Sequence, residues 1–196
     1  MPPDHGIDPI AIDVRSLMQR TVASLYSHLV TRPTGRAVRL AIEGQLSGPN
    51  ARTLSVIDLS EVTLIDFSCA DEVVAKLLLK YPRDDAKREA FFVFHGVRFP
   101  HREPIEAVLE RHDLWAVAET GEGRFELLGP LGAGHRRIWA AVEDQGVLPT
   151  ARAMELGVNG DGEVSVQWLL DHRLLFRTDD GHDLVALSQL VRDLLD

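Results

Sequence analysis

Residues 54–80 change their hydrophobic period in mid-course, and this change constrains the fold more than any other feature of the chain. Residues 54–59 form a short run rich in apolar and β-branched side chains, which is typical of a strand buried on both faces of a sheet. From Asp66 onward apolar residues recur at helical spacing, and Asp66 and Ser68 offer side-chain oxygens to the start of a helix. The sequence therefore predicts a strand, a short loop and a helix, which together make an α/β unit.

Two motifs, Asp58-Leu59-Ser60 and Ile65-Asp66-Phe67-Ser68, stand at the ends of this loop, with Val62 between them. In spacing and chemistry they resemble the STAS fold of anti-sigma-factor antagonists. A wider set of motifs is similar to the STAS-like family of unknown function: Arg32, Gly35-Arg36, Asp58, Val62 and the run Ser68-Cys69-Ala70-Asp71-Glu72. The resemblance covers roughly residues 30–128 and implies an α/β domain, with a mixed sheet and helices, over residues 10–128.

Ser68 matches the phosphorylated serine of the antagonists. The resemblance therefore implies a non-enzymatic regulatory protein that works through a protein partner, either a serine-kinase-like ATPase or an anti-sigma factor, with phosphorylation of Ser68 as the switch. A serine at a helix start is also a common N-cap, so both roles of Ser68 stay open. The candidate partner-binding residues are Asp66, Ser68, Asp71, Glu72, Arg32, Arg36 and Arg39.

Three arginines, Arg32, Arg36 and Arg39, gather near the start of a second predicted helix that Pro33 can begin. Such a group suits a nucleotide phosphate, another anion or a partner's carboxylates, which would make the chain a small-molecule sensor or a partner-binding module. Charge runs are more often a solvated helix face, and on that interpretation the arginines are exposed and each substitution by alanine costs little stability.

The remaining pattern of the first 128 residues predicts further elements of the same domain. Residues 1–9 are rich in proline and are expected to be disordered. Apolar residues at helical spacing predict a helix over 14–30, which serves a partner, a homodimer or the domain core. A strand is expected at 90–94, then a helix with Pro104 in its first turn, and a hairpin over 115–128.

Glycine and proline mark a linker at 129–134, beyond which the pattern changes. Residues 135–196 predict three helices, a strand-turn-strand and a last helix, an order that resembles a winged-helix domain. In such folds the third helix usually reads DNA, but here it carries Glu163 and Asp171. The arginines that could bind DNA lie elsewhere, at Arg136, Arg137 and Arg177. Pairing with protein, or a structural cap, is the other interpretation of this domain.

Composition narrows the function further. A formal net charge of −9 argues against general binding to nucleic acid or to an anionic membrane. The sequence shows no apolar stretch of membrane-spanning length and no secretory leader, so a cytoplasmic protein is expected. The single cysteine, Cys69, excludes an intrachain disulfide, and the histidines lack metal-ligand spacing, so no metal and no cofactor are expected.

No common catalytic motif is present, and we do not expect an enzyme. Asp66, Asp71 and Glu72 could form an acid/base pair, although acids at a helix start are also the ordinary complement of the helix dipole. Cys69 is either a reactive thiol or, more commonly, a buried one. The sequence thus favours a regulator that acts by protein-protein interaction. The alternative is a transcription regulator that binds DNA with its C-terminal domain and senses a signal with the STAS-like part.

Overall fold

The computed structural model describes residues 7–16, 28–46, 52–81, 89–121 and 123–195. The chain forms two compact units that meet in the sequence between Pro130 and Leu131, inside the glycine-rich segment 129–134. Within the described ranges, no helix is both long and apolar enough to cross a membrane.

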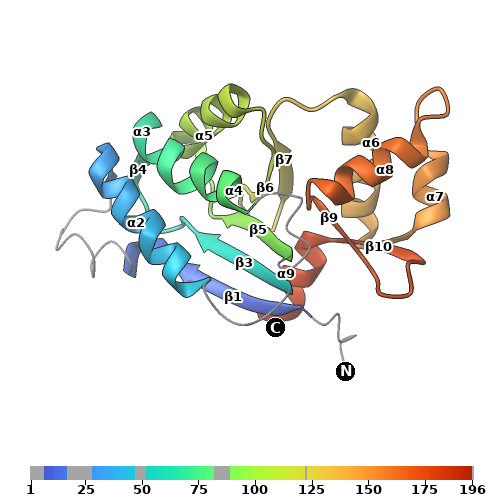
Figure 1. The fold of residues 1–196 in the computed structure, drawn as a ribbon, viewed down its shortest axis with the longest axis horizontal. Helices are drawn as coiled ribbons and strands as arrows, with labels where there is room; N and C mark the ends of the chain where they lie inside the picture. Colours follow the sequence, from blue (N-terminus) through green and yellow to red (C-terminus); the bar gives the residue numbers. More distant parts are fainter. Residues whose placement is uncertain (1–6, 17–27, 47–51, 82–88, 122, 196) are drawn as a thin grey trace. The chain divides into compact units, whose positions relative to one another are not determined.

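The first unit is built on a five-stranded sheet in the order β1-β3-β5-β6-β7 (Figure 1). The first four strands are parallel, and the edge strand β7 runs antiparallel to β6. The strands are β1 (Asp8–Asp13), β3 (Arg52–Asp58), β5 (Glu89–His95), β6 (Ala116–Glu119) and β7 (Phe125–Leu128). The sheet is therefore mixed, as the resemblance implied, and the predicted strand at 54–59 corresponds to β3, which lies between β1 and β5.

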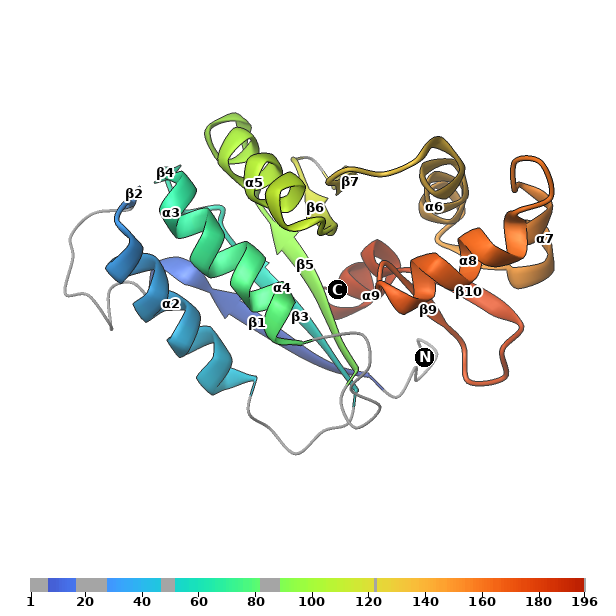
Figure 2. The same ribbon diagram turned by 45° about the horizontal axis from the view of Figure 1, so that its top comes forward.

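The helices of this unit lie side by side on one face of the sheet (Figures 1 and 2). Right-handed crossovers between strands that advance in one direction place every connecting helix on the same face. These helices are α2 (Arg32–Gln45), α5 (Phe99–His112), and a continuous helical segment made of α3 (Phe67–Ala70), a π-helical part (Asp71–Ala75) and α4 (Lys76–Lys80). The π part is a wider turn of a kind that often marks functional sites in helices.

The core of the first unit lies between these helices and the sheet. Ile57 of β3 and Phe94 of β5 sit beside each other in the parallel register and are both fully buried. Apolar residues from all three helical segments pack into the same cluster: Val38, Ile42, Val73, Val74, Leu77, Ile105, Val108 and Leu109. The change of hydrophobic period in residues 54–80 thus corresponds to strand β3 and to the helical segment that packs on the sheet.

Several expected elements of the first unit differ from the structure. Strand β1 begins at Asp8, inside the segment expected to be disordered, of which residues 1–6 lie outside the described ranges. The helix predicted over 14–30 is wrong at its C-terminal end, because His28–Leu29 forms strand β2 and pairs with β4 (Leu64–Ile65). Residues 17–27 are outside the described ranges.

The helix expected to begin at Pro104 starts earlier, at Phe99, and Pro100 is the proline of its first turn. Pro104 is inside α5, where it cannot donate a backbone hydrogen bond to the preceding turn. The capping interactions at the start of α5 explain the earlier beginning, since Nδ1 of His101 accepts a 3.2 Å hydrogen bond from the backbone N–H of Arg98.

The second unit contains the elements that its pattern predicts and one additional strand. Its three-stranded antiparallel sheet has the order β8-β10-β9. The elements are α6 (Ala133–Gln145), β8 (Val147–Pro149), α7 (Thr150–Glu155), α8 (Gly162–Asp171), β9 (Leu175–Arg177), β10 (Asp183–Ala186) and α9 (Leu187–Leu195). The additional strand is β8, which is only three residues long and was not predicted from the sequence. Buried Ile138, Val166 and Leu184 come from α6, α8 and β10.

Candidate functional site

Asp66 caps the helical segment that follows β4, as the sequence predicts. Its Oδ1 accepts the backbone N–H of Cys69 at 2.8 Å and the Ser68 hydroxyl at 2.9 Å. Its Oδ2 accepts the N–H of Thr31 at 3.2 Å, immediately before α2. Burial opposes the charge on Asp66, but these hydrogen bonds outweigh it and lower the pKa of the carboxyl. One ionised side chain thus fixes the starts of two helices.

Ser68 is half-buried in a hollow between α3 and α5. The hollow has a volume of about 290 Å³ and is lined by Arg32, Phe67, Ser68, Asp71, Ala107, Val108 and Arg111. Arg111 is exposed and, within the described residues, makes no side-chain hydrogen bond or ion pair. Phe67, next to Ser68 in sequence, is 51% exposed. The predicted switch residue therefore lies between an exposed aromatic ring and two arginines.

Asp71 and Glu72 are the first two residues of the π-helical part, and they are only 6% and 2% exposed. Nη1 of Arg32 donates to both carboxylates, at 2.6 Å to Asp71 and 2.9 Å to Glu72. Nε2 of His112, at the end of α5, lies 2.8 Å from Oδ1 of Asp71. Asp71 therefore links all three helical elements of the unit.

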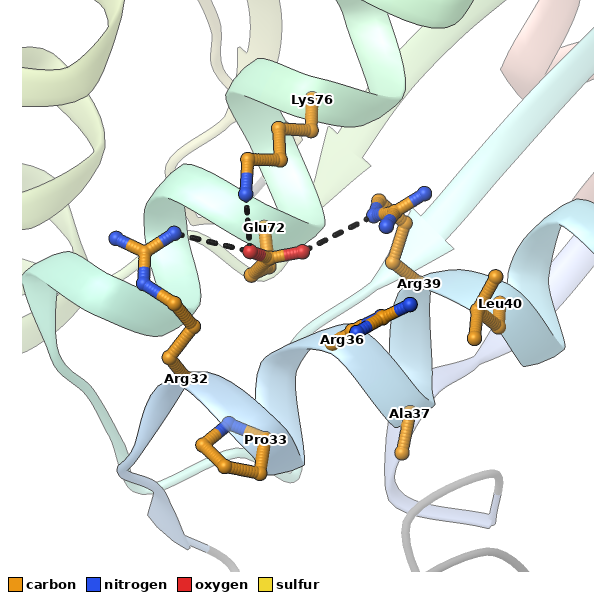
Figure 3. Close-up of a pocket in the computed structure, with 8 residues that line it drawn as sticks. All are labelled: Arg32, Pro33, Arg36, Ala37, Arg39, Leu40, Glu72 and Lys76. Atoms are coloured by element: carbon orange, nitrogen blue, oxygen red, sulfur yellow. Dashed lines mark hydrogen bonds and ion pairs between the residues drawn. The ribbon is translucent and has the colours of Figure 1, made fainter.

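Glu72 is the centre of a wider ion network on the α2 side (Figure 3). It accepts hydrogen bonds from Lys76 and from Nε of Arg39, the latter at 3.2 Å. Arg39 also donates to the buried Glu43 at 2.5 Å, and Lys80 donates to Glu43 at 2.5 Å. The network therefore joins α2 to the π-helical part and to α4.

The three buried carboxylates, Glu43, Asp71 and Glu72, are held ionised. Burial works against their charge, but the hydrogen bonds from Lys80 and Arg39 to Glu43, from Arg32 and His112 to Asp71, and from Lys76, Arg32 and Arg39 to Glu72 lower all three pKa values. A general acid needs a raised pKa, so these carboxyls are arranged to bind cations rather than to donate protons at neutral pH.

The structure brings most of the predicted site residues together: Asp66, Ser68, Asp71, Glu72, Arg32 and Arg39. The expectation of an exposed arginine face is wrong for Arg39, whose side chain is 16% exposed because it pairs with two buried glutamates. Arg36 is exposed and, in the described part of the chain, has no hydrogen bond or ion pair.

Sequence reasoning missed five residues of the Ser68 hollow and the ion network. Two of them carried a usable signal, because Glu43 follows Arg39 and Lys76 follows Glu72 at the four-residue spacing of helical ion pairs. Lys80, Arg111 and His112 carried none, since their positions depend on how distant elements pack.

Cys69 is fully buried, and its thiol lies 3.0 Å from the carbonyl oxygen of Thr31. Burial, reinforced by the charge of Asp66, raises the pKa of the thiol to about 12. The buried-thiol interpretation therefore applies, and the reactive one is wrong. Among the described residues, no three histidine, cysteine or acidic side chains are placed to hold a metal ion.

The DNA-binding candidates of the second unit do not lie on α8. Arg136 and Arg137 are in the first turns of α6, and Arg177 ends β9. The exposed side chains of α8 are Glu163, Val164, Gln167 and Asp171, and the helix contains no lysine or arginine.

The surface around Ser68 and the ion network around Glu72 are thus the two candidate sites of the first unit, and they share Arg32. Comparisons of the chain with protein-family models, with curated proteins and with solved structures find no match.

Proposed function

We propose that this protein is a non-enzymatic regulator that binds a partner protein on the surface around Ser68. The observation that carries the proposal is a group of exposed apolar side chains at the start of the α3 segment. Phe67 is 51% exposed, Leu64 is 41% exposed, and Val30 is 38% exposed. Exposed apolar groups that gather at one place are a common mark of a protein-binding surface.

The local backbone brings the segments that carry these side chains together. Leu64 is paired with His28 in the short parallel ladder of β2 and β4, and the N–H of Asp66 donates to the carbonyl of Leu29 at 2.9 Å. Val30 and Leu64 therefore flank the capped turn from which Phe67 projects. Asp66 holds this turn with three hydrogen bonds, which favour one conformation of the surface and so reduce the entropy lost when a partner binds.

Phosphorylation of Ser68 would change this surface in two ways. The phosphate would add about −1.5 to −2 charges and remove the hydroxyl that donates to Asp66. Asp66 and Asp71, the latter a lining residue of the hollow, would repel it, whereas Arg111 and Arg32 of the same hollow would attract it. A partner that docks an apolar surface on Phe67 would then meet a strongly anionic group at the neighbouring Ser68. Such a change is suited to releasing that partner.

The resemblance to anti-sigma-factor antagonists supports the same proposal and suggests two partner classes, a serine-kinase-like ATPase and an anti-sigma factor. The second unit has the order helix-strand-helix-helix-strand-strand, which resembles that of a winged-helix domain. Its α8 surface, however, is acidic and carries the exposed Val164, which favours contact with protein over contact with phosphates.

The proposal is tested with the full-length chain and its candidate partners, taken from the ATPases and anti-sigma factors encoded in the same genome. Each purified pair is examined by titration calorimetry, with wild type, Phe67→Ser, Ser68→Asp and Ser68→Ala. The matched control is Phe99→Ser, because Phe99 is 93% exposed in the same unit but lies at the start of α5.

We expect Phe67→Ser and Ser68→Asp to weaken binding while Phe99→Ser and Ser68→Ala retain it. Thermal unfolding of each variant separates lost binding from lost folding. A partner that binds Phe67→Ser and Ser68→Asp as tightly as wild type would place the interaction elsewhere and overturn the proposal.

A further inference from the structure

A second hollow of the first unit lies on the α2 side of the ion network. It is a groove of about 630 Å³, within the size range of small-molecule sites, and it is lined by Arg32, Pro33, Arg36, Ala37, Arg39, Leu40, Glu72 and Lys76 (Figure 3). Four of these eight residues are cationic and one is acidic. The groove is therefore a positive site on a chain whose net charge is −9.

Ion pairs hold three of the cationic side chains in the groove in place, but not all of their N–H donors make hydrogen bonds. Glu72 anchors Arg32, Arg39 and Lys76, and it is almost completely buried beneath them. Arg32 donates to the two carboxylates through Nη1 alone, and its side chain is 50% exposed. Its Nε and Nη2 make no hydrogen bond in the described part of the chain. An ion network that fixes donors while leaving some unused is preorganised for an added anion.

Arg36 is the arginine of the groove that has no carboxylate partner among the described residues. It lies four residues after Arg32 and three before Arg39, so the three guanidinium groups share one face of α2, and like charges at these spacings destabilise a helix. It carries no dashed line in Figure 3, and no described carboxylate offsets it. A bound anion would remove this repulsion.

The remaining wall of the groove is apolar. Pro33, Ala37 and Leu40 line it from α2, and Leu40 is 50% exposed. An inorganic ion would gain nothing from contact with these apolar side chains, whereas the organic part of a larger ligand would bury them favourably.

We propose that this groove binds a small organic phosphate, with the phosphate held by Arg36, Arg32 and Lys76 and the organic part resting on Leu40. The guanidinium groups supply paired N–H donors that match phosphate oxygens. This function is separate from partner binding at Ser68, and it would give the regulator a metabolite input at a groove that shares Arg32 with the hollow of Ser68.

The test uses the full chain and isothermal titration at low ionic strength with adenosine 5′-monophosphate, a hexose phosphate, inorganic phosphate and adenosine. The variants are Arg36→Ala and Leu40→Ser. Arg124→Ala is the control for charge, since Arg124 is exposed in the same unit and has no side-chain hydrogen bond among the described residues. Arg36 is chosen over Arg32 because Arg32 also lines the hollow of Ser68.

We expect at least one organic phosphate to bind more tightly than inorganic phosphate, and adenosine not to bind. Arg36→Ala should weaken the organic phosphate about tenfold or more, as the loss of a charge-assisted hydrogen bond does, while Arg124→Ala leaves it unchanged. Leu40→Ser should weaken the organic phosphate but not inorganic phosphate.

Three results would each overturn the proposal. The first is that no phosphate binds wild type at low salt. The second is that Arg36→Ala and Arg124→Ala bind equally well. The third is that inorganic phosphate binds wild type as tightly as either organic phosphate, which would leave the apolar wall around Leu40 without a role in binding.

Discussion

Nε of Arg39 donates a hydrogen bond of 3.2 Å to Glu72, a carboxylate that is only 2% exposed. Arg36, three residues earlier on the same helix, is exposed and free of such contacts within the described residues. Two arginines that look equivalent in sequence therefore have different physical roles. Arg39 compensates the buried charges of Glu43 and Glu72, whereas Arg36 faces the groove and solvent.

We predict that Arg39→Ala destabilises the first unit by about 2 kcal/mol, because it removes one cationic partner from each of two buried carboxylates, Glu43 and Glu72. Arg36→Ala should change stability by less than about 0.5 kcal/mol. Urea denaturation of the two variants measures the difference. Equal, small effects would mean that Glu43 and Glu72 are adequately solvated or paired without Arg39.

The close contact of α2 with α3 provides a second matched pair, Gly35 and Gly44, on one helix. A Cβ at Gly35 would lie 2.9 Å from Cα of Cys69 and 3.1 Å from Cβ of Glu72, whereas a Cβ at Gly44 would have nothing within 4 Å. Gly35→Ala should therefore cost about 1–3 kcal/mol by overpacking. Gly44→Ala should raise the free energy of unfolding by about 0.5–1 kcal/mol, since alanine is the better helix former. Thermal melts that shift in the same direction for both variants would contradict this assignment.

The parts of the fold that could be predicted are those set by neighbouring residues. The change of period after residue 59 located β3 and the following helix, and the carboxyl of Asp66 was recognisable as a cap. The hairpin of β6 and β7 followed from two apolar runs around a glycine-containing turn. Each of these depends on contacts within a few residues.

The parts that could not be predicted depend on distant packing. His112 reaches Asp71 across 41 residues, and nothing at either position indicates it. Strand β2 exists because it pairs with β4, so a helical stripe in its own residues was misleading. The π-helical part also has no sequence signature, yet it is the part in which the adjacent Asp71 and Glu72 are both buried. Several arginines and acids of the ion network were therefore named from the sequence, but the pairs that they form were not predicted.

The buried thiol of Cys69 gives a direct prediction. Because its pKa is raised to about 12 and the side chain is fully buried, very little thiolate exists at pH 8 in the native state. A maleimide or iodoacetamide should therefore label the folded chain far more slowly than the chain in denaturant, and mass spectrometry follows the modification. Rapid labelling of the native protein would show that the contact between α2 and α3 opens readily.

The buried carboxylates predict that the first unit loses stability in acid. The pKa values of Glu43, Asp71 and Glu72 are lower in the folded state than their ordinary values of 4.5, 3.8 and 4.5. A lowered folded-state pKa means that the unfolded chain takes up protons first as the pH falls. The stabilisation is therefore complete above about pH 5.5 and is lost progressively as the pH falls through about 4.5 toward the folded-state pKa values.

Glu72→Gln isolates one of these contributions. The variant removes the charge that Arg32, Arg39 and Lys76 share, so it should be less stable than wild type by about 2 kcal/mol at pH 7, with a shallower dependence of unfolding free energy on pH between 5 and 3. Glu143, whose pKa burial raises, contributes with the opposite sign, but it is present in both proteins and cancels in the comparison. Urea titrations at a series of pH values measure both slopes. Parallel slopes would show that Glu72 is not the carboxylate through which acid destabilises the unit, because a group that titrates differently in the two states must appear in the difference.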